Sequence, residues 1–481
     1  MRVHWASYAG RMPRTVPNWV PVLDRTAGPS LPSQIAATVR RDVASGALRP
    51  GEPLPSSRVL ARRLSVSRGS VESAYDQLLA EGYLLSRARS GTFVNPHLRT
   101  PAPHRGDAAS AARPSAAKPL ARLDLTPGHD THSPLDDPAW RSAWRRAGDP
   151  GRGHTNRPTD PMGEMVVRAA VSEHLRLMRG LVVDPARIVI TAGSRDGLAL
   201  LLAALSASGA PPRVGVEDPG FPGLRATLRR RGIEMVLLPV DDHGLVVPGS
   251  DEDAEAPGVV LVTPNHQFPF GSAMPATRRT ELLEWASNRG TMVVEDDYDS
   301  EFRYVGPPSP ALYGLVPGAP VVHLGTFSGM LSRDVGTGYL LLPDALVDLI
   351  TAVRADLGCP VAPILQRAVA DYLAEGGLRR RLQRSRRRLL TAQDMVASSL
   401  QTIPGSVDHG RMMVVEAPPE QAARIRQACL ERGVLLGDLA QGWTRSPGST
   451  GVVLAYGSVT PQELAIALDV LGSVVRDVAG H

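Results

Sequence analysis

Lysine is almost absent from this sequence of 481 residues. Among its 53 lysines and arginines, Lys118 is the only lysine. An arginine guanidinium stays protonated, whereas lysine is the side chain that supplies a primary amine for imine chemistry. Chemistry that needs a side-chain amine therefore has a single candidate in the whole chain. A bias of this kind fits genome composition, but it limits what the protein can catalyse.

Cysteine and long apolar runs are also scarce. The two cysteines, Cys359 and Cys429, offer neither a disulfide framework nor the spacing of metal ligands, so we expect both to be small buried side chains and expect no metal site. No apolar run approaches the roughly 18 residues of a membrane-spanning helix, and residues 1–10 lack the layout of a signal peptide. We therefore expect a cytoplasmic protein with no membrane partner.

Positive charge is concentrated at the N-terminal end of the chain. The whole chain carries +5, but residues 1–97 carry about +7, because thirteen arginines there face six acids, and the remainder carries about −2. A chain of 481 residues is also too long for one core, so two or more domains are expected. A basic head on a nearly neutral body suits a DNA-binding module joined to a part that need not touch DNA.

Residues 31–97 carry the pattern of three helices followed by a hairpin. Apolar residues recur at helical spacing from Leu31, and Gly46 stands where this first helix would stop. Ser57 and Ser67 can cap a second and a third helix. The apolar segments on either side of Ser90-Gly91 indicate two short antiparallel strands. Three helices and a hairpin predict an α+β winged helix-turn-helix domain.

Short motifs recur through this predicted domain. They are Leu54-Pro55-Ser56-Ser57-Arg58, Ser65-Val66-Ser67-Arg68-Gly69-Ser70-Val71, Glu81-Gly82-Tyr83 and Ser90-Gly91-Thr92-Phe93-Val94. Over nearly the whole of residues 31–96 they resemble the GntR family of regulators. The resemblance implies a double-stranded DNA operator as partner, with the third helix in the major groove and the wing near phosphate. DNA contacts are implied for six residues: Arg58, Ser67, Arg68, Ser70, Gly91 and Thr92. The alternative for the two arginines is a solvated surface position.

The remainder of the chain alternates short β-branched runs with helical stretches. Residues 98–122, rich in Ala, Pro, Arg and Ser, read as a linker between an N-terminal part and a body. Beyond it, strand-like runs at 187–190, 258–262, 291–294 and 321–324 alternate with helices, which predicts an α/β fold with a mainly parallel sheet. We expect an N-terminal extension (1–30), the winged helix-turn-helix domain (31–97), the linker and an α/β body (123–481) with a smaller C-terminal subdomain.

Five blocks of the body follow one another in a recognisable order. They are Thr191-Ala192-Gly193-Ser194, Val216-Glu217-Asp218-Pro219-Gly220-Phe221-Pro222-Gly223, the segment 262–269, the segment 294–304 and Leu324-Gly325-Thr326-Phe327-Ser328. These blocks resemble the pyridoxal-phosphate (PLP) dependent fold type I aminotransferases, in the version found in MocR-type regulators. The resemblance implies a homodimer with a head-to-tail arrangement.

The resemblance also implies a cofactor-binding role for five residues. Ser194 would start a helix whose free N–H groups hold a phosphate, and Ser328 would be a second phosphate ligand. Phe221 would stack on the cofactor ring, Asp296 would pair with the pyridine nitrogen, and Tyr298 would lie beside the ring oxygen. Ordinary alternatives are a core phenylalanine, a helix cap and a carboxylate in a salt bridge.

Residues 326–339 depart from the family at two positions. In the family, the residue after the serine is the lysine that forms the Schiff base, and an arginine for the phosphate follows seven residues later. Here these positions hold Gly329 and Gly336. Glycine has no amine for an imine, so we expect no covalent cofactor, no catalytic residue and no transamination. Arg333 or Arg195 as a substitute for the phosphate arginine is an alternative.

These observations predict a DNA-binding transcription regulator whose degenerate aminotransferase-like domain senses a small-molecule effector without a covalent bond. The effector is left open among PLP, pyridoxamine phosphate, a preformed imine of PLP with an amino acid, and an unrelated metabolite. One other hypothesis is a large domain that serves only as a dimerisation scaffold. Another is an enzyme, PLP-dependent or using His266, Asp296 or Asp297 as acid or base.

An arginine-rich run at residues 379–388 is a second basic feature. Its helical spacing with Leu378, Leu382, Leu389 and Leu390 favours the solvated face of an amphipathic helix. An auxiliary DNA-binding surface is the alternative.

Overall fold

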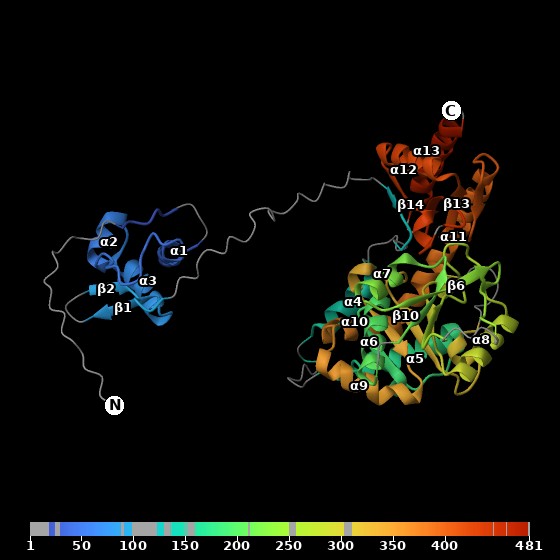
Figure 1. The fold of residues 1–481 in the computed structure, drawn as a ribbon, viewed down its shortest axis with the longest axis horizontal. Coiled ribbons are helices and arrows are strands. Elements are labelled where there is room, and N and C mark those ends of the chain that lie inside the picture. The colour runs from blue at the N-terminus through green and yellow to red at the C-terminus, as the bar shows by residue number, and fades with distance from the viewer. Residues whose placement is uncertain are drawn as a thin grey trace. The chain divides into compact units, whose positions relative to one another are not determined.

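The chain divides into two compact units, residues 1–116 and 117–481 (Figure 1). The computed structural model describes residues 19–24, 29–87, 91–98, 123–128, 135, 137–149, 151, 159–209, 212–249, 256–302, 310–445, 447–457 and 459–479. Lys118, residues 99–122 and residues 303–304 of the fourth block lie outside the described residues. None of the helices within these ranges is both long and apolar enough to span a bilayer.

The first unit is a winged helix-turn-helix, as predicted. Its elements are α1 (Leu31–Ala44), α2 (Ser57–Leu64), α3 (Arg68–Ala80), β1 (Leu84–Arg87) and β2 (Gly91–Val94), the two strands pairing antiparallel. The apolar stripe of α1, with Ile35 and Val39 fully buried, packs against Leu78 of α3. Trp19 packs on this core from the N-terminal side and donates to Asp42 (2.7 Å).

Serine side chains cap α2 and α3, but one of them is not the predicted residue. Ser67 caps α3, accepting a hydrogen bond from the Ser70 amide (3.1 Å). For α2 the cap is Ser56, which has extended backbone and accepts from the Val59 amide (3.4 Å). The expectation that Ser57 caps α2 was wrong, because Ser57 is already helical; its hydroxyl donates to Glu72 of α3 instead (3.2 Å).

The second unit is built on an eight-stranded sheet with the order β4-β11-β10-β9-β8-β5-β6-β7. The strands are β4 (Ile188–Thr191), β5 (Val214–Asp218), β6 (Met235–Asp241), β7 (Gly244–Leu245), β8 (Val259–Val262), β9 (Met292–Asp297), β10 (Val321–Thr326) and β11 (Gly338–Leu341). From β6 through β5, β8 and β9 to β10 all pairs are parallel, and β4, β7 and β11 pair antiparallel with their neighbours. The predicted mainly parallel sheet is confirmed.

Helices cover both faces of this sheet. They are α4 (Pro138–Ala147), α5 (Met165–Arg179), α6 (Ser194–Ala207), α7 (Pro222–Arg230), α8 (Ala276–Arg289), α9 (Asp344–Leu357) and α10 (Pro363–Ala374). Alternate residues of β4 show the two faces, because Ile188 and Ile190 join the core beneath α4, α5 and α10, whereas Val189 joins the core beneath α6. Burial on both faces explains why these strands read as continuous apolar runs.

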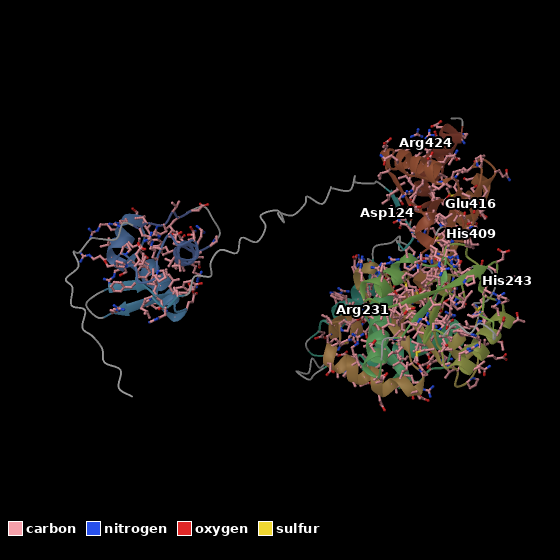
Figure 2. All side chains as sticks on the ribbon, viewed as in Figure 1. Asp124, Arg231, His243, His409, Glu416 and Arg424 are labelled. Carbon is pink, nitrogen blue, oxygen red and sulfur yellow. The ribbon has the colours of Figure 1, made fainter. Side chains whose placement is uncertain are left out.

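A smaller C-terminal subdomain is built on a five-stranded sheet with the order β12-β13-β15-β14-β3. Its strands are β3 (Leu123–Leu125), β12 (Ser406–Asp408), β13 (Met412–Glu416), β14 (Val434–Asp438) and β15 (Gly451–Ala455), and α11 (Gly377–Leu400), α12 (Pro419–Glu431) and α13 (Pro461–Ala479) pack on it. Figure 2 places His409 on the side of this subdomain that faces the larger sheet. Cys429 is buried in its core as expected, while Cys359, outside it, is only half-buried.

The arginine-rich run lies on α11 and is not a uniformly solvated face. Arg379, Arg380, Arg384 and Arg387 are exposed, as predicted. Arg381, in contrast, is only 6% exposed and donates to the backbone carbonyls of Met330 and Leu331, each at 2.9 Å. The amphipathic pattern missed this, because it cannot distinguish a buried arginine that reaches carbonyl groups from a solvated one.

Candidate ligand-binding site

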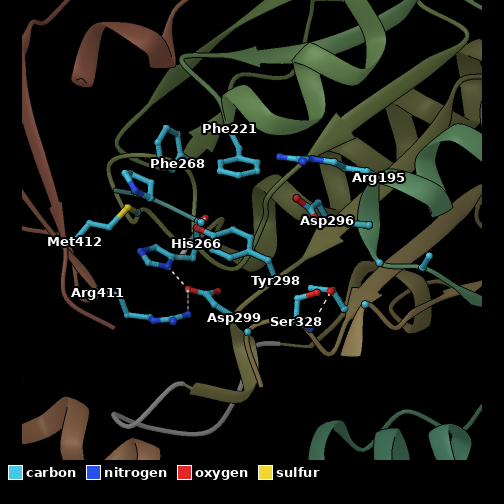
Figure 3. A pocket seen from close by; sticks show the side chains of 18 residues that line it. Arg195, Phe221, His266, Phe268, Asp296, Tyr298, Asp299, Ser328, Arg411 and Met412 are labelled. Carbon is cyan, nitrogen blue, oxygen red and sulfur yellow. Dashed lines mark hydrogen bonds and ion pairs between the residues drawn. The ribbon is translucent and has the colours of Figure 1, made fainter. Parts of the chain in front are cut away.

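A cavity of about 320 Å³ opens where the carboxyl ends of β4, β5, β8, β9 and β10 meet the C-terminal subdomain (Figure 3). In open α/β sheets, ligands bind at this edge of the sheet. The five residues predicted to bind a cofactor come from separate blocks, yet all line this cavity: Ser194, Phe221, Asp296, Tyr298 and Ser328. Gly329 and Gly336 line it as well.

The last residues of β9 point to opposite faces of the sheet, as successive residues of a strand do. Asp296 faces the cavity. Glu295 faces away and accepts from the Leu312 amide (3.0 Å) and from His323 Nδ1 (3.0 Å). Asp297 is also buried and forms an ion pair with Arg179. Of the two β9 carboxylates considered as an acid or base, only that of Asp296 therefore faces the cavity.

Asp296 is held at the floor of the cavity without a hydrogen-bond partner for its Oδ1 among the described residues. The residue is only 5% exposed. Burial, followed by the nearby carboxylates of Asp297, Glu217 and Asp299, raises the pKa of Asp296 to about 8. An acceptor that is buried and unpaired is costly, so this carboxyl group is poised for a donor that enters from the cavity.

The Phe221 ring lines one side of the cavity. It is the N-cap residue of α7, three residues after the end of β5, and contacts Phe268 edge-on with 5.5 Å between ring centroids. A Cβ atom on Gly223 would lie 2.5 Å from the Phe221 ring, and one on Gly128 would lie 3.3 Å from it. The Phe221 ring can occupy this position only because residues 128 and 223 are glycines. It presents an apolar face to the cavity.

Tyr298 belongs to a polar group with His266 and Asp299 on the opposite side. The Tyr298 hydroxyl donates to the His266 carbonyl (2.8 Å), and the two rings are stacked with centroids 5.9 Å apart. His266 Nδ1 pairs with Asp299, and its Nε2 lies 2.9 Å from the His409 carbonyl oxygen. Burial opposes protonation of His266, but the Asp299 carboxylate outweighs it and raises the pKa of His266. Because its proton is already donated, the Tyr298 hydroxyl can only accept from a ligand.

The start of α6 forms an end of the cavity suited to an anion. Gly193 precedes the helix with φ of 88°, a conformation that favours glycine, and Ser194 is the first helical residue. A Cβ atom on Gly193 would lie 3.8 Å from Ser328 Oγ, so the two serines belong to one end of the cavity. Arg195 extends from the same turn toward Phe221 (Figure 3). Free N–H groups, hydroxyls and a cation together favour a phosphate.

The two glycines that depart from the family pattern differ in backbone conformation. A Cβ atom on Gly329 would meet Phe302 and the Tyr298 carbonyl oxygen at 3.7 Å, which is ordinary contact. Gly336, in contrast, has φ of 48°, in the left-handed region that costs other residues on the order of 1 kcal/mol. A side chain is therefore tolerated at Gly329 and strained at Gly336.

Sequence reasoning missed the contribution of the C-terminal subdomain to this cavity. Arg411, just before β13, and Met412, its first residue, line the wall opposite the sheet, and Phe268 and Thr326 are further residues that line the cavity. Arg411 is 6% exposed, and its Nη1 lies 3.8 Å from Asp299. No local sequence pattern predicts that Arg411 lines the cavity, because it reaches the cavity only through the packing of two subdomains. A lone arginine before an apolar strand was the sole signal.

The predicted DNA-contacting residues are exposed or half-buried in the first unit. Arg58 on α2, Ser67 and Arg68 at the start of α3 and Gly91 on the wing are exposed, and Ser70 and Thr92 are half-buried. Arg68 donates to Glu72 one turn later (2.7 Å). Since Ser57 of α2 binds the same carboxylate oxygen of Glu72, this residue links the two helices beside the expected contact surface.

Comparisons with known proteins match both units. The family described as "Bacterial regulatory proteins, gntR family" matches residues 31–94, and "Aminotransferase class I and II" matches residues 128–469. The HTH-type pyridoxine biosynthesis transcriptional regulator PdxR of Corynebacterium glutamicum is 41% identical over 433 residues, covering 89% of this chain and 92% of its own. The probable rhizopine catabolism regulatory protein MocR of Rhizobium meliloti is 29% identical over 480 residues, covering 94% and 95%.

Solved structures share the fold of the second unit. The α-aminoadipate aminotransferase LysN of Thermus thermophilus superposes with a TM-score of 0.63 at 23% identity, covering 74% of this chain and 93% of its own. At this identity the likeness concerns the fold alone. The family matches and this likeness confirm the predicted fold class of both units.

Proposed function

The chain belongs to the MocR-type regulators, in which a GntR-family DNA-binding domain precedes a class I and II aminotransferase domain, and from this premise we propose that it is a DNA-binding transcription regulator whose large unit binds a PLP-type effector without a covalent bond. The printed name of the 41% identical relative, a pyridoxine biosynthesis regulator, supports an effector of this chemical class.

The buried, unpaired Asp296 carboxyl group carries the proposal for the effector site. A protonated pyridine nitrogen is a donor that would satisfy Asp296 Oδ1, which has no hydrogen-bond partner among the described residues. Phe221 would cover one face of the ring, and Ser194 and Ser328 would hold the phosphate at the start of α6. Tyr298 would accept a hydrogen bond from a ring hydroxyl. The residues present therefore fit PLP or a close derivative.

The missing lysine is the reason to propose recognition rather than catalysis. PLP supplies an electron sink to enzymes that hold it on a lysine and use an amine to move protons. In this chain, position 329 is glycine and the single lysine, Lys118, lies in the segment expected to be a linker. No amine of the body can therefore bind the cofactor covalently. The open cavity supports ligand binding over a scaffold role alone, since a vestigial site would be expected to fill with its own side chains.

The effector proposal is tested by titrating the full-length protein with PLP and with pyridoxamine phosphate. A ligand present at 100 times its Kd stabilises the folded state by about 2.7 kcal/mol, so the melting temperature should rise. Asp296→Asn should lose most of this rise, whereas Asp469→Asn, at an exposed aspartate of α13, should keep it. Unchanged melting and unchanged DNA affinity of the wild type with both compounds would contradict the proposal.

The DNA-binding proposal is tested with an operator selected from a random library by the wild-type protein. Arg68→Ala should weaken binding by about tenfold or more, since a specific arginine contact to a base is worth about 1–3 kcal/mol. Arg230→Ala, at an exposed arginine of α7, serves as the matched control. Equal losses in both variants would mean that α3 does not contribute the specific contact.

A further inference from the structure

The arginine at the start of α3 is held by a carboxylate of the same helix. Arg68 Nε donates to Glu72 Oε1 at 2.7 Å. The hydroxyl of Ser57, the first residue of α2, donates to the same oxygen at 3.2 Å. One carboxylate oxygen therefore accepts from two helices, and one of its donors is the guanidinium that is predicted to contact DNA.

The donor on α2 restricts the Glu72 side chain more than an isolated ion pair would. An exposed pair one helical turn apart contributes little by itself, because both long side chains lose freedom in forming it. Here the buried Tyr75 hydroxyl of α3 also donates to the Pro55 carbonyl, at 2.8 Å. Since Pro55 lies two residues before Ser57, the beginning of α2 is joined to α3 at two points. The hydroxyl that binds Glu72 is thus itself fixed relative to α3.

The stability of α3 does not explain this arrangement. Arg68 is the first residue of the helix, where the helix dipole disfavours a positive charge. The pair also places the basic residue before the acidic one, which is the less favourable order on a helix. The Arg68 side chain is 65% exposed and that of Glu72 is 43% exposed. A cation held in this place suits a partner that enters from solvent better than it suits the helix.

The atom that Glu72 binds determines which donors of Arg68 remain for such a partner. A guanidinium carries its five N–H groups in one plane, one on Nε and two on each Nη. Because the Arg68 Nε–H is donated to Glu72, the two Nη groups at the tip form the remaining fork. Two parallel donors match the O6 and N7 acceptors of guanine in the major groove. Adenine offers N7 beside an amino donor, so it can accept only one arm of the fork.

From this geometry we propose that Glu72 is a positioning residue that gives Arg68 its preference for guanine, by holding Arg68 Nε so that both Nη groups face one base. The inference rests on the proposed function, in which the start of α3 enters the major groove. An arginine that is already held loses less side-chain freedom on binding. The Glu72 carboxylate itself is repelled by phosphate, so it raises specificity at the expense of non-specific affinity.

The test measures discrimination at a single base pair. An operator is selected from a random library with the full-length wild-type protein, and the guanine bound by Arg68 is the position at which Arg68→Ala loses discrimination. Fluorescence anisotropy then gives the affinity for this operator, for the same operator with A·T in place of that G·C pair, and for a duplex of random sequence. The wild type should bind the operator about tenfold or more tightly than the A·T duplex.

Variants of the carboxylate then decide whether Glu72 causes this discrimination. Glu72→Ala removes the acceptor and should bind the operator and the A·T duplex within about threefold of each other, while its affinity for random DNA stays equal or rises. Glu72→Gln keeps an acceptor without the charge and should retain part of the discrimination. Ser57→Ala keeps the Glu72 charge and should lower the discrimination by about two- to threefold.

Asp76→Ala is the matched control for the change of charge. Asp76 is exposed and lies one turn after Glu72 on α3, so its replacement removes a carboxylate from the same helix. It should discriminate as the wild type does. If Glu72→Ala fails to fold or binds random DNA more weakly than the wild type, Glu72→Gln and Ser57→Ala take its place in the comparison.

Each outcome decides one claim. Lost discrimination at the base pair bound by Arg68, with undiminished affinity for random DNA, supports the inference. Wild-type discrimination in Glu72→Ala overturns it, as does an equal loss in Asp76→Ala. A loss at a different base pair also overturns it, because Glu72 would then contact a base itself. If Arg68→Ala keeps its discrimination at every base pair, the inference fails and DNA binding stands. If the wild type selects no sequence, the DNA-binding proposal fails together with the inference.

Discussion

Asp296 lies near the end of β9, Gly329 lies three residues after the end of the neighbouring strand β10, and the two residues affect the chemistry of the cavity in opposite ways. In the proposed function, Asp296 would pair with a protonated ring, whereas Gly329 offers no amine that could bind the ring covalently. A cavity that retains the first and lacks the second can bind reversibly. Reversible binding is what a regulator needs in order to respond to concentration.

The raised pKa of Asp296 predicts a specific dependence of stability on pH. Its pKa is about 8 in the fold against 3.8 in the unfolded chain, so the folded state binds the extra proton between these values. Stability contributed by this group is present below about pH 4 and is lost as the pH rises toward 8. Asp296→Asn removes the loss and should therefore be more stable than the wild type at pH 7, by on the order of 1 kcal/mol or more.

Urea unfolding at pH 5, 6, 7 and 8 measures this difference. The gap between Asp296→Asn and the wild type should widen with pH, while Asp469→Asn should follow the wild type throughout. A gap that stays constant from pH 5 to 8 would show that Asp296 titrates normally.

Restoring an amine at position 329 predicts a covalent PLP adduct. Gly329→Lys meets only ordinary contacts at its Cβ atom, so the variant should fold. With PLP it should acquire the visible absorbance of lysine-bound cofactor and, after borohydride reduction, the mass of a phosphopyridoxyl group. Gly329→Met, which has a side chain without an amine, is the control. A folded Gly329→Lys protein that acquires neither signal would place the ring elsewhere.

At the scale of elements, the buried strands and the winged helix-turn-helix could be predicted from the sequence, because both depend on local pattern. Runs such as Val259–Val262 are apolar on both faces and therefore predict a buried parallel strand. The start of α2 could not be placed to the residue, since Ser56 and Ser57 are equally good caps by composition. The floor of the cavity was predictable because its residues follow strands in recognisable blocks.

The wall formed by Arg411 could not be predicted in the same way. Its place depends on how β13 and α11 pack against the segment after β9, and none of these contacts has a local signal. The α11 arginines illustrate the same limit, since residues of equal polarity lie three apart and end in different surroundings. Arg381 is buried, and Arg384 is exposed.

Arg381 should therefore be far more important for stability than its neighbours on α11. It donates to the Met330 and Leu331 carbonyls, directly after Gly329, from a buried position. Arg381→Met leaves these two acceptors without that partner and should lower the free energy of unfolding by about 2–4 kcal/mol. Arg384→Met should change it by less than about 0.5 kcal/mol. Urea denaturation of both variants gives the comparison, and similar losses would refute a structural role for Arg381.

At the scale of the whole molecule, the first strand of the large unit belongs to its last subdomain. β3 pairs in parallel with β14, so residues 123–125 are joined to a sheet whose other strands come from residues 406–455. Leu125 is fully buried in that core. The C-terminal subdomain therefore needs a strand from the opposite end of its unit to complete its sheet.

This pairing predicts that a substitution near residue 125 unfolds a region more than 250 residues away. Leu125→Ala should destabilise the protein by about 2–5 kcal/mol, the usual cost of removing a buried leucine side chain. Hydrogen exchange should accelerate in β13 to β15, while Leu123→Ala, at a half-buried residue of the same strand, should cost less. Exchange that accelerates only around residue 125 would show that β3 is not an integral strand of this sheet.

The pairing of β3 with β14 also determines which sheet of the large unit follows the first unit in chain order. In chain order, β3 is the first described element after the first unit, and it lies in the sheet whose strand β13 directly follows Arg411. The sheet that borders the cavity is therefore also the sheet that holds the first described strand after the first unit.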